Sequence, residues 1–393
     1  MKRDAPPASK PSLAERAETK QFGTLALRVD EVRLWRRHMA LATFGRTARG
    51  GVNRQALSPE EIEARAALVS WGREIGLHPS VDGIGNLFLR LTGVDDTRPP
   101  ILTGSHIDSQ PTGGKFDGAF GVLAALEALQ AIVEAGVRPP RSIELVAWTN
   151  EEGSRFAPGM MGSEAFSGAR PLDEMLNIRD ASGTTAAEAL QSVFEAMPDI
   201  ERRQTGFPVA AYIEAHIEQG PELEARGKLV GVVTGIQGSR RFRINVLGEE
   251  SHAGTTPRHA RKDSLSAAVA MIAALERAIC DEEDIVKFTV GMFKVEPNAP
   301  SVVPGIVYFS IDLRHPVART LTDLGDQIAP ICAAHKGSCQ VEVKEIAHAG
   351  PLDFPAPIQS VIREVAEGLG IDTMDILRWS QKIGQVAKVY STG

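Results

Sequence analysis

The chain has 393 residues, of which 43% are hydrophobic and 24% charged, and this length exceeds what one ordinary core accommodates, so two domains are expected. The formal net charge of −7 and the lack of a basic stripe argue against a nucleic-acid or anionic-membrane partner. The three cysteines lack metal-type spacing and are typical of reduced thiols in a cytoplasmic protein. No apolar run reaches membrane-spanning length.

Residues 1–24 are rich in proline, lysine and glutamate, which predicts a flexible leader. From residue 25 to residue 231, helix-like and strand-like patterns alternate, which predicts the first part of an α/β domain. Ser58 and Pro59 are typical of a helix start, and this helix is expected to end at Ile75. Strands are predicted over 86–91, 100–103 and 142–148, with a helix between the last two that ends at Gly136.

The pattern changes after residue 231. The predicted order is a strand over 241–246, a helix over 264–279, strands over 288–295 and 306–313, a helix over 321–335 and a strand over 338–346. This is the split βαβ order of a small, ferredoxin-like α+β domain, which we place at 232–348. Phe288, Val290 and Met292 are expected on one face of their strand. Residues 349–393 are expected to return to the first domain.

The polar stretch GSHIDSQPTGGKFDG, residues 104–118, follows a predicted strand and carries His106, Asp108 and Asp117. A turn of the chain alone does not require a histidine and two aspartates. The glycines and the proline allow a tight turn, and a carboxylate just before a helix suits the positive helix N-terminus. The stretch therefore contains candidate ligands.

Two further places carry candidate ligands. Glu151 and Glu152 follow the strand over 142–148, and His216 lies in YIEAHIEQG. Ligands gather beyond the carboxyl ends of strands in open α/β sheets. Imidazole and carboxylate groups together suit Zn²⁺, Mn²⁺, Co²⁺ or Ni²⁺. Of two adjacent glutamates, one can bind metal while the other takes a proton from water.

Each signal also has an ordinary structural interpretation. A single loop histidine is more often hydrogen-bonded than ligating, and adjacent glutamates usually lie on a solvated surface. The glutamate pair is the stronger signal, because it ends an apolar strand. Several such signals in one chain are harder to explain by chance.

Five successive segments resemble one family, the hydantoinase/carbamoylase-type amidases, a branch of the di-metal aminoacylase and carboxypeptidase-like hydrolases. The segments are GSHIDSQPTGGKFDGAFGV, WTNEEGSRFAPGMMGS, EAHIEQGPELE, GIQGSRRFRINVLGEESHAGTTP and VEPNAPSVVPG. Their order and spacing resemble the family over about residues 25–376. The resemblance implies an α/β, aminopeptidase-like catalytic domain with an inserted ferredoxin-like domain that acts as a lid and pairs two subunits.

The resemblance also implies two divalent ions, Zn, Mn, Co or Ni, in each subunit. His106 and His216 would hold one ion, Asp117 would bridge, and Glu152 would hold the second ion. Glu151 would be the general base.

Further roles follow from the same resemblance. Asp108 would orient the imidazole of the nearby histidine ligand. His252 would reach the active site of the partner subunit and stabilise an oxyanion, although it could simply cap a turn. Gln219, Asn298 and Arg314 match substrate-binding positions, with Arg314 as the fork for a substrate carboxylate. By themselves, Arg314 could be an exposed strand residue and Asn298 part of a turn.

Residues 377–393 depart from the family pattern. The family continues with a segment like SGAGHDA and a terminal histidine that binds the second ion, whereas no histidine follows His348 here. A frameshift or truncation near Leu377 is the simplest account, and a naturally altered tail is the alternative. Either implies weak binding of the second ion and low activity.

The resemblance thus predicts a hydrolase that cleaves the ureido C–N bond of N-carbamoyl-L-amino acids or N-carbamoyl-β-alanine. The products are the amino acid, carbon dioxide and ammonia. Allantoate, an N-acyl amino acid or a dipeptide is the alternative substrate. A catalytically impaired dimer that binds carboxylate ligands or acts as a scaffold is the alternative of another class.

Overall fold

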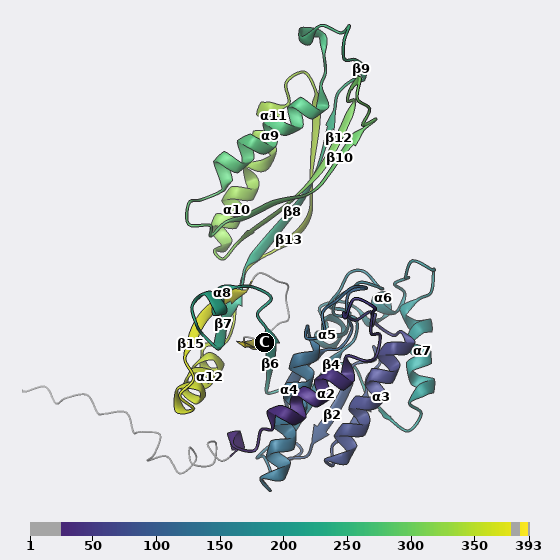
Figure 1. Ribbon diagram of the computed structural model, residues 1–393, viewed down its shortest axis with the longest axis vertical. Coiled ribbons are helices and arrows are strands. Elements are labelled where there is room, and N and C mark those ends of the chain that lie inside the picture. The colour runs from purple at the N-terminus through teal and green to yellow at the C-terminus, as the bar shows by residue number, and fades with distance from the viewer. Residues whose placement is uncertain (1–24, 379–385, 392–393) are drawn as a thin grey trace, which may run out of the picture. The chain divides into compact units, whose positions relative to one another are not determined.

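The computed structural model describes residues 25–378 and 386–391, and the expected leader lies outside them. The described chain divides into two compact units (Figure 1). Unit 1 comprises residues 25–233, 355–376 and 386–391, and unit 2 comprises residues 234–354 with 377–378. The sequence predicted that the inserted domain extends from residue 232 to residue 348. No helix among the described residues is long and apolar enough to cross a membrane.

Unit 1 is built on a mixed sheet with a parallel centre. Neighbouring strands run parallel in the order β16-β6-β3-β4. The antiparallel strands β2 and β1 follow β4, and β7 lies antiparallel to β16. The bounds are β1 (His78–Val81), β2 (Leu87–Leu91), β3 (Ile101–His106), β4 (Ile143–Trp148), β5 (Glu201–Arg202), β6 (Ala211–Ile217), β7 (Val230–Ile236), β15 (Thr373–Arg378) and β16 (Val386–Ser391).

Local sequence signals set the main helices of unit 1. The predicted helix start is confirmed, because α3 (Pro59–Glu74) begins with a proline and the Ser58 hydroxyl accepts the Glu61 N–H at 3.3 Å. The apolar stripe of α4 (Ala119–Glu134) packs against β3, β4 and β6. The other helices are α2 (Glu31–Leu41), α5 (Met161–Ser167), α6 (Leu172–Leu176), α7 (Ala186–Ala196), α8 (Glu222–Ala225) and α12 (Ala356–Gly368).

The parallel register brings polar strand ends together. In the β3–β4 pair, His106 lies opposite Trp148, three residues before Glu151. Strand β3 therefore runs to His106 rather than stopping at Thr103 as predicted. Because β6 pairs with the other side of β3, the carboxyl ends of β3, β4 and β6 lie at one edge of the sheet.

Unit 2 has a four-stranded antiparallel sheet in the order β10-β12-β8-β13. The helices pack on one face, with a buried apolar core between helices and sheet. This confirms the predicted ferredoxin-like arrangement. Its elements are β8 (Gly238–Leu247), β9 (Ser251–His252), η1 (Arg258–Ala260), α9 (Ser264–Ile279), β10 (Lys287–Glu296), β11 (Val302–Val303), β12 (Ile306–His315), α10 (Ala318–Asp326), α11 (Ile328–His335), β13 (Gln340–Ala349) and β14 (Leu352–Asp353).

The predicted single helix over 321–335 is wrong, because the structure has two helices that meet at Gln327. Pro330 lies in the first turn of α11. A proline ring clashes with the carbonyl four residues earlier, which here belongs to Asp326, the last residue of α10. A single residue, Pro330, therefore accounts for the break between the two helices.

The expected face of β10 is also partly wrong. Phe288 and Val290 pack against the core of unit 2, but Met292 is 42% exposed. The pairing with β12 shifts between Val290 and Met292, and such a bulge moves the following side chains to the other face. Val295 packs against the core instead.

Candidate metal centre

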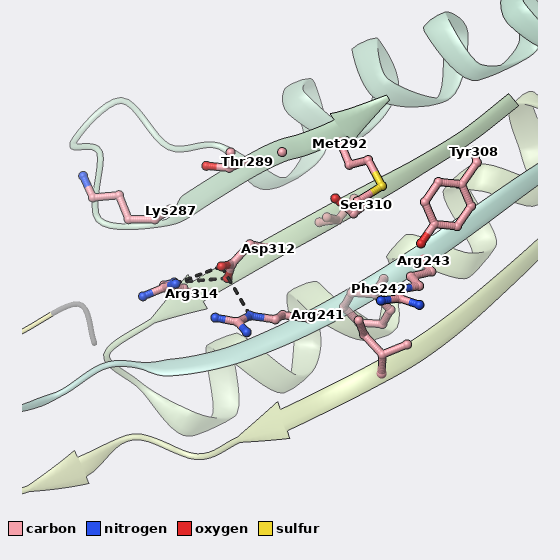
Figure 2. A pocket seen from close by; sticks show the side chains of 13 residues that line it. Arg241, Phe242, Arg243, Lys287, Thr289, Met292, Tyr308, Ser310, Asp312 and Arg314 are labelled. Carbon is pink, nitrogen blue, oxygen red and sulfur yellow. Dashed lines mark hydrogen bonds and ion pairs between the residues drawn. The ribbon is translucent and has the colours of Figure 1, made fainter. Parts of the chain in front are cut away.

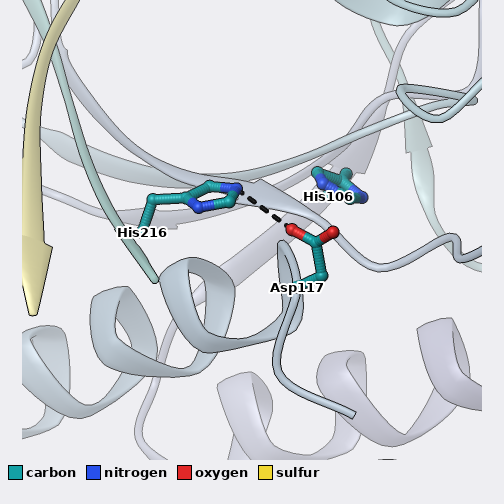
Figure 3. Close-up of side chains that lie close together, drawn as sticks. All are labelled: His106, Asp117 and His216. Carbon is teal, nitrogen blue, oxygen red and sulfur yellow. Dashed lines mark ion pairs between the residues drawn. The ribbon is translucent and has the colours of Figure 1, made fainter. Parts of the chain in front are cut away.

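Three side chains from separate elements of unit 1 converge at the edge of the sheet (Figure 3). His106 ends β3, Asp117 lies just before α4, and His216 lies near the end of β6. One potential ligand atom of each lies within 4.8 Å of the others. The His216 Nε2 atom is 3.3 Å from Asp117 Oδ1.

Both imidazoles are held in the form that suits a ligand. The Nδ1 atom of His106 lies 3.0 Å from the Asp108 carbonyl, and the Nδ1 atom of His216 lies 2.8 Å from the Ile217 carbonyl. Because a carbonyl only accepts, each Nδ1 carries the proton and donates. Each Nε2 then has a lone pair for an ion. A histidine that binds a metal usually donates its other ring N–H in this way.

The donor set fits a divalent transition metal. Two imidazoles and a carboxylate are a common three-ligand set for Zn²⁺. Ligands at about 2.1 Å from a tetrahedral ion lie about 3.4 Å apart, close to the 3.3 Å between His216 and Asp117. Burial lowers the pKa of His106, but Glu151, Asp108 and Asp117 outweigh it and raise that pKa well above its usual range. Surplus negative charge that draws a proton to a buried imidazole also favours a bound cation.

The two glutamates that follow β4 differ in their surroundings. A carboxylate oxygen of Glu151 lies 3.5 Å from His106 Nε2. The Glu152 carboxylate accepts a hydrogen bond from Gln110 at 3.0 Å and is not part of the three-residue group found among the described residues. Burial raises the pKa of Glu152, and Asp117 and Glu151 add to this, whereas His106 and Gln110 oppose it.

Asp108 contacts both halves of the centre. Its carbonyl accepts the imidazole proton of His106 at 3.0 Å, while its carboxylate lies 3.5 Å from the same nitrogen. The carboxylate also accepts the backbone N–H groups of Glu151 and Glu152 at 3.2 and 3.1 Å. The sequence assigned Asp108 to the imidazole alone, so the contact with the glutamate backbone is an additional finding.

Sequence reasoning missed Arg54, which is buried beneath this loop and only 2% exposed. Its guanidinium donates to the carbonyls of Ile107, Leu41 and Phe44 at 2.7, 2.9 and 3.0 Å. Ser109 adds a reciprocal pair of hydrogen bonds with the Arg54 backbone. Burial lowers the pKa of Arg54 to about 10, so the side chain remains a cation at neutral pH. No local pattern around Arg54 marks it, because its partners are distant in sequence.

Gln219 lies beside the centre. Its amide donates to Asp117 Oδ2 at 2.7 Å, and its backbone has a φ of 58°, the left-handed region that non-glycine residues seldom adopt. The sequence proposed a substrate contact for Gln219. The structure places it against a candidate metal ligand.

The remaining predicted site residues belong to unit 2. The His252 Nδ1 atom accepts the backbone N–H groups of Gly254 and Thr255 at 3.1 and 3.2 Å, so the ring proton is on Nε2. Arg314 donates to the Asp312 carboxylate from Nε at 3.1 Å and from Nη2 at 2.8 Å. Asn298 is exposed with a φ of 57°.

Comparison with known proteins shows the family to which the chain belongs. The model of peptidase family M20/M25/M40 matches residues 102–390. An N-carbamoyl-L-amino-acid amidohydrolase of Rhizobium meliloti is 34% identical over 374 residues, which cover 92% of this chain and 88% of the relative. An allantoate amidohydrolase of Bacillus subtilis is 38% identical over 281 residues, covering 70% and 66%.

Solved structures give the same result. The crystal structure of a hydantoinase/carbamoylase family amidase from Burkholderia ambifaria matches with a TM-score of 0.85 and 37% identity, covering 94% of this chain and 92% of that chain. The chain therefore belongs to peptidase family M20/M25/M40, a family of hydrolases. Within it, the chain belongs with the hydantoinase/carbamoylase amidases, and it is a hydrolase that acts on C–N bonds.

The close approach of Gly118 to His106 gives a first prediction. A Cβ atom at Gly118 would lie 2.4 Å from His106 Nε2, so Gly118→Ala should displace the imidazole and weaken zinc binding at least roughly tenfold. The matched control is Gly136→Ala, which has nearly the same φ, 66° against 62°, but meets nothing within 4 Å. Both variants place an alanine at a positive φ, and thermal unfolding measures the loss of stability in each. Equal zinc affinity in the two would contradict the steric account.

Proposed function

We propose that this chain hydrolyses the ureido C–N bond of N-carbamoyl-L-amino acids or of N-carbamoyl-β-alanine. The observation that carries the proposal is the His106, Asp117 and His216 group with Glu151 beside it, 3.5 Å from His106. The names of the relatives, N-carbamoyl-L-amino-acid amidohydrolases at 34–41% identity, support the substrate class. Residue roles below are part of the proposal.

When bound, a divalent ion polarises a carbonyl and lowers the pKa of water. Glu151, 24% exposed, is the general base that takes a proton from the attacking water. The hydroxide oxygen forms a bond to the ureido carbon, and the bond from that carbon to the amino-acid nitrogen breaks. Glu151 then delivers its proton to the leaving amine. Carbamate is released and decomposes to carbon dioxide and ammonia.

Two residues of unit 2 complete the proposed chemistry. Because the Nδ1 atom of His252 is engaged by backbone N–H groups, its Nε2–H is available to donate to a developing oxyanion. Arg314, whose Nε and Nη2 donate to Asp312, is the residue we propose to bind a substrate carboxylate through its guanidinium. We propose that the chain forms a homodimer through unit 2 and that His252 acts in the active site of the partner subunit.

Allantoate is the second candidate substrate, favoured by allantoate amidohydrolases at 38% and 37% identity. An N-acyl amino acid or a dipeptide is a further alternative. A panel of these compounds with ammonia and amine detection separates them. The expected catalytic impairment rested on residues 377–393, most of whose side chains lie outside the described residues, and the comparisons give it no support.

Glu151→Gln tests the general base. Glutamine keeps the size of the side chain but accepts no proton, so we expect retained zinc and a loss of turnover of at least roughly a thousandfold. Glu224→Gln, which changes an exposed carboxylate of α8, is the control for loss of a carboxylate. Turnover of the Glu151 variant within about tenfold of the parent, or ~1.4 kcal/mol, would contradict the assignment.

Metal content tests the number of ions. The three-ligand group should hold one ion per chain after dialysis, whereas the second ion should be lost, because Glu152 lies outside that group among the described residues and carboxylates alone hold a transition metal weakly. Elemental analysis per chain is the measurement. Two ions that survive dialysis together with full turnover would show that another residue completes a second site.

Hybrid dimers test the role of His252. Chains with Glu151→Gln or His252→Ala should each be inactive, and mixing them after dissociation should restore part of the activity. Some hybrids would combine an intact base with an intact histidine from the other chain. Inactivity in hybrids verified by mass spectrometry would argue against catalysis across subunits.

A further inference from the structure

The face of the unit 2 sheet that carries no helices is unusually cationic. Side chains alternate along β12, so Leu313, Ile311 and Phe309 enter the core while Arg314, Asp312 and Ser310 lie on the open face. On β8, Arg241 and Arg243 share this open face. Figure 2 shows these side chains projecting from one side of the strands.

The open face is hollowed into a cavity of about 560 Å³, within the range of small-molecule sites. Four cationic side chains and one carboxylate line it, and Met292, Tyr308 and Ile346 give it an apolar part. The charged residues are Arg241, Arg243, Lys287, Arg314 and Asp312. Met292 reaches the cavity because of the bulge in β10.

One carboxylate serves two guanidinium groups in this cavity. Asp312 accepts two hydrogen bonds from Arg314, and its Oδ2 atom lies 3.5 Å from Arg241 Nε. The strand register places Lys287 directly opposite Arg314, and Lys287 pairs with Asp284 at the rim. Like charges opposite each other in a sheet are destabilising, and the carboxylates of Asp312 and Asp284 offset part of this repulsion.

Arg243 is the member of the cluster whose surroundings most favour the binding of an anion. It is exposed and lies opposite Ser310 on β12 and Lys344 on β13, so its cross-strand neighbours are a hydroxyl and another cation. Among the residues that the structure describes, no ion pair involves Arg243. A merely solvated sheet face would be expected to alternate charges of opposite sign.

We propose that this cavity binds a second anionic group of the substrate, so that the preferred substrates are N-carbamoyl derivatives of acidic amino acids. This rests on the proposed function, in which Arg314 takes the α-carboxylate. Arg241 and Arg243 take the side-chain carboxylate, with Lys287 adding positive potential. Alternate residues of a strand are about 6.8 Å apart, so long arginine side chains from neighbouring rows can converge on two carboxylates of one small molecule.

The test compares substrates that differ only in charge. N-carbamoyl-L-aspartate and N-carbamoyl-L-asparagine have nearly the same shape, as do the glutamate and glutamine derivatives. For the parent enzyme we expect kcat/KM to favour the acidic substrate by roughly tenfold to a hundredfold, the range for a charge-assisted hydrogen bond. The preference should shrink as salt is added. A parent enzyme that favours the neutral substrate would overturn the proposal.

Substitution locates the effect. Arg243→Gln should lower kcat/KM for the aspartate derivative far more than for the asparagine derivative and so abolish the preference. The control is Lys344→Gln, which removes a cation opposite Arg243 in register but outside the cavity lining and should keep the preference. Thermal unfolding checks that both variants are folded. Equal losses on both substrates in the Arg243 variant, or loss of the preference in the Lys344 variant, would overturn the proposal.

Direct binding separates this proposal from the proposed function. Calorimetry on the Glu151→Gln chain with the same two compounds measures affinity without turnover. Tighter binding of the aspartate derivative, lost in the Glu151→Gln, Arg243→Gln chain, supports the anion cavity even if no ureido compound is hydrolysed. Equal affinities for the two compounds would overturn the anion cavity even if both are hydrolysed.

Discussion

The contacts of Asp108 join the two halves of the candidate centre. Its carbonyl fixes the tautomer of His106, and its carboxylate fixes the backbone of Glu151 and Glu152. The loops after β3 and β4 therefore share one anchor, and the parallel pairing of those strands places them at the same edge of the sheet. Because Arg54 binds the Ile107 carbonyl of the same loop and ties it to the carbonyls of Leu41 and Phe44, the candidate ligand His106 and Glu151 are positioned before any ion or substrate arrives.

Features with a local cause could be predicted from the sequence. The helix over 264–279 was placed at the observed bounds of α9, because its amphipathic pattern lies within the segment itself. The start of α3 followed from Ser58 and Pro59. The order of strands and helices in unit 2 sufficed for its ferredoxin-like fold, since few chain paths fit that order.

Features that depend on distant partners could not be predicted in this way. The bulge in β10 arises from its pairing with β12, and a period-two pattern contains no sign of it. Arg54 contacts Ile107 across 53 positions, so its burial is invisible locally. The break at Pro330 was different, because its cause is local and the apolar pattern around it obscured it.

The two ends of unit 2 lie next to each other. Phe354 N–H donates to the Thr234 carbonyl at 2.8 Å, and Asp353 and Leu352 pair with Gly235 and Ile236. A segment with adjacent ends and its own apolar core is a module in the chain, since its removal leaves a gap that a short turn can bridge. Such a module can be exchanged between related enzymes or circularly permuted without re-routing the strands of unit 1. The substrate preference proposed for unit 2 could then be inherited separately from the metal binding proposed for unit 1.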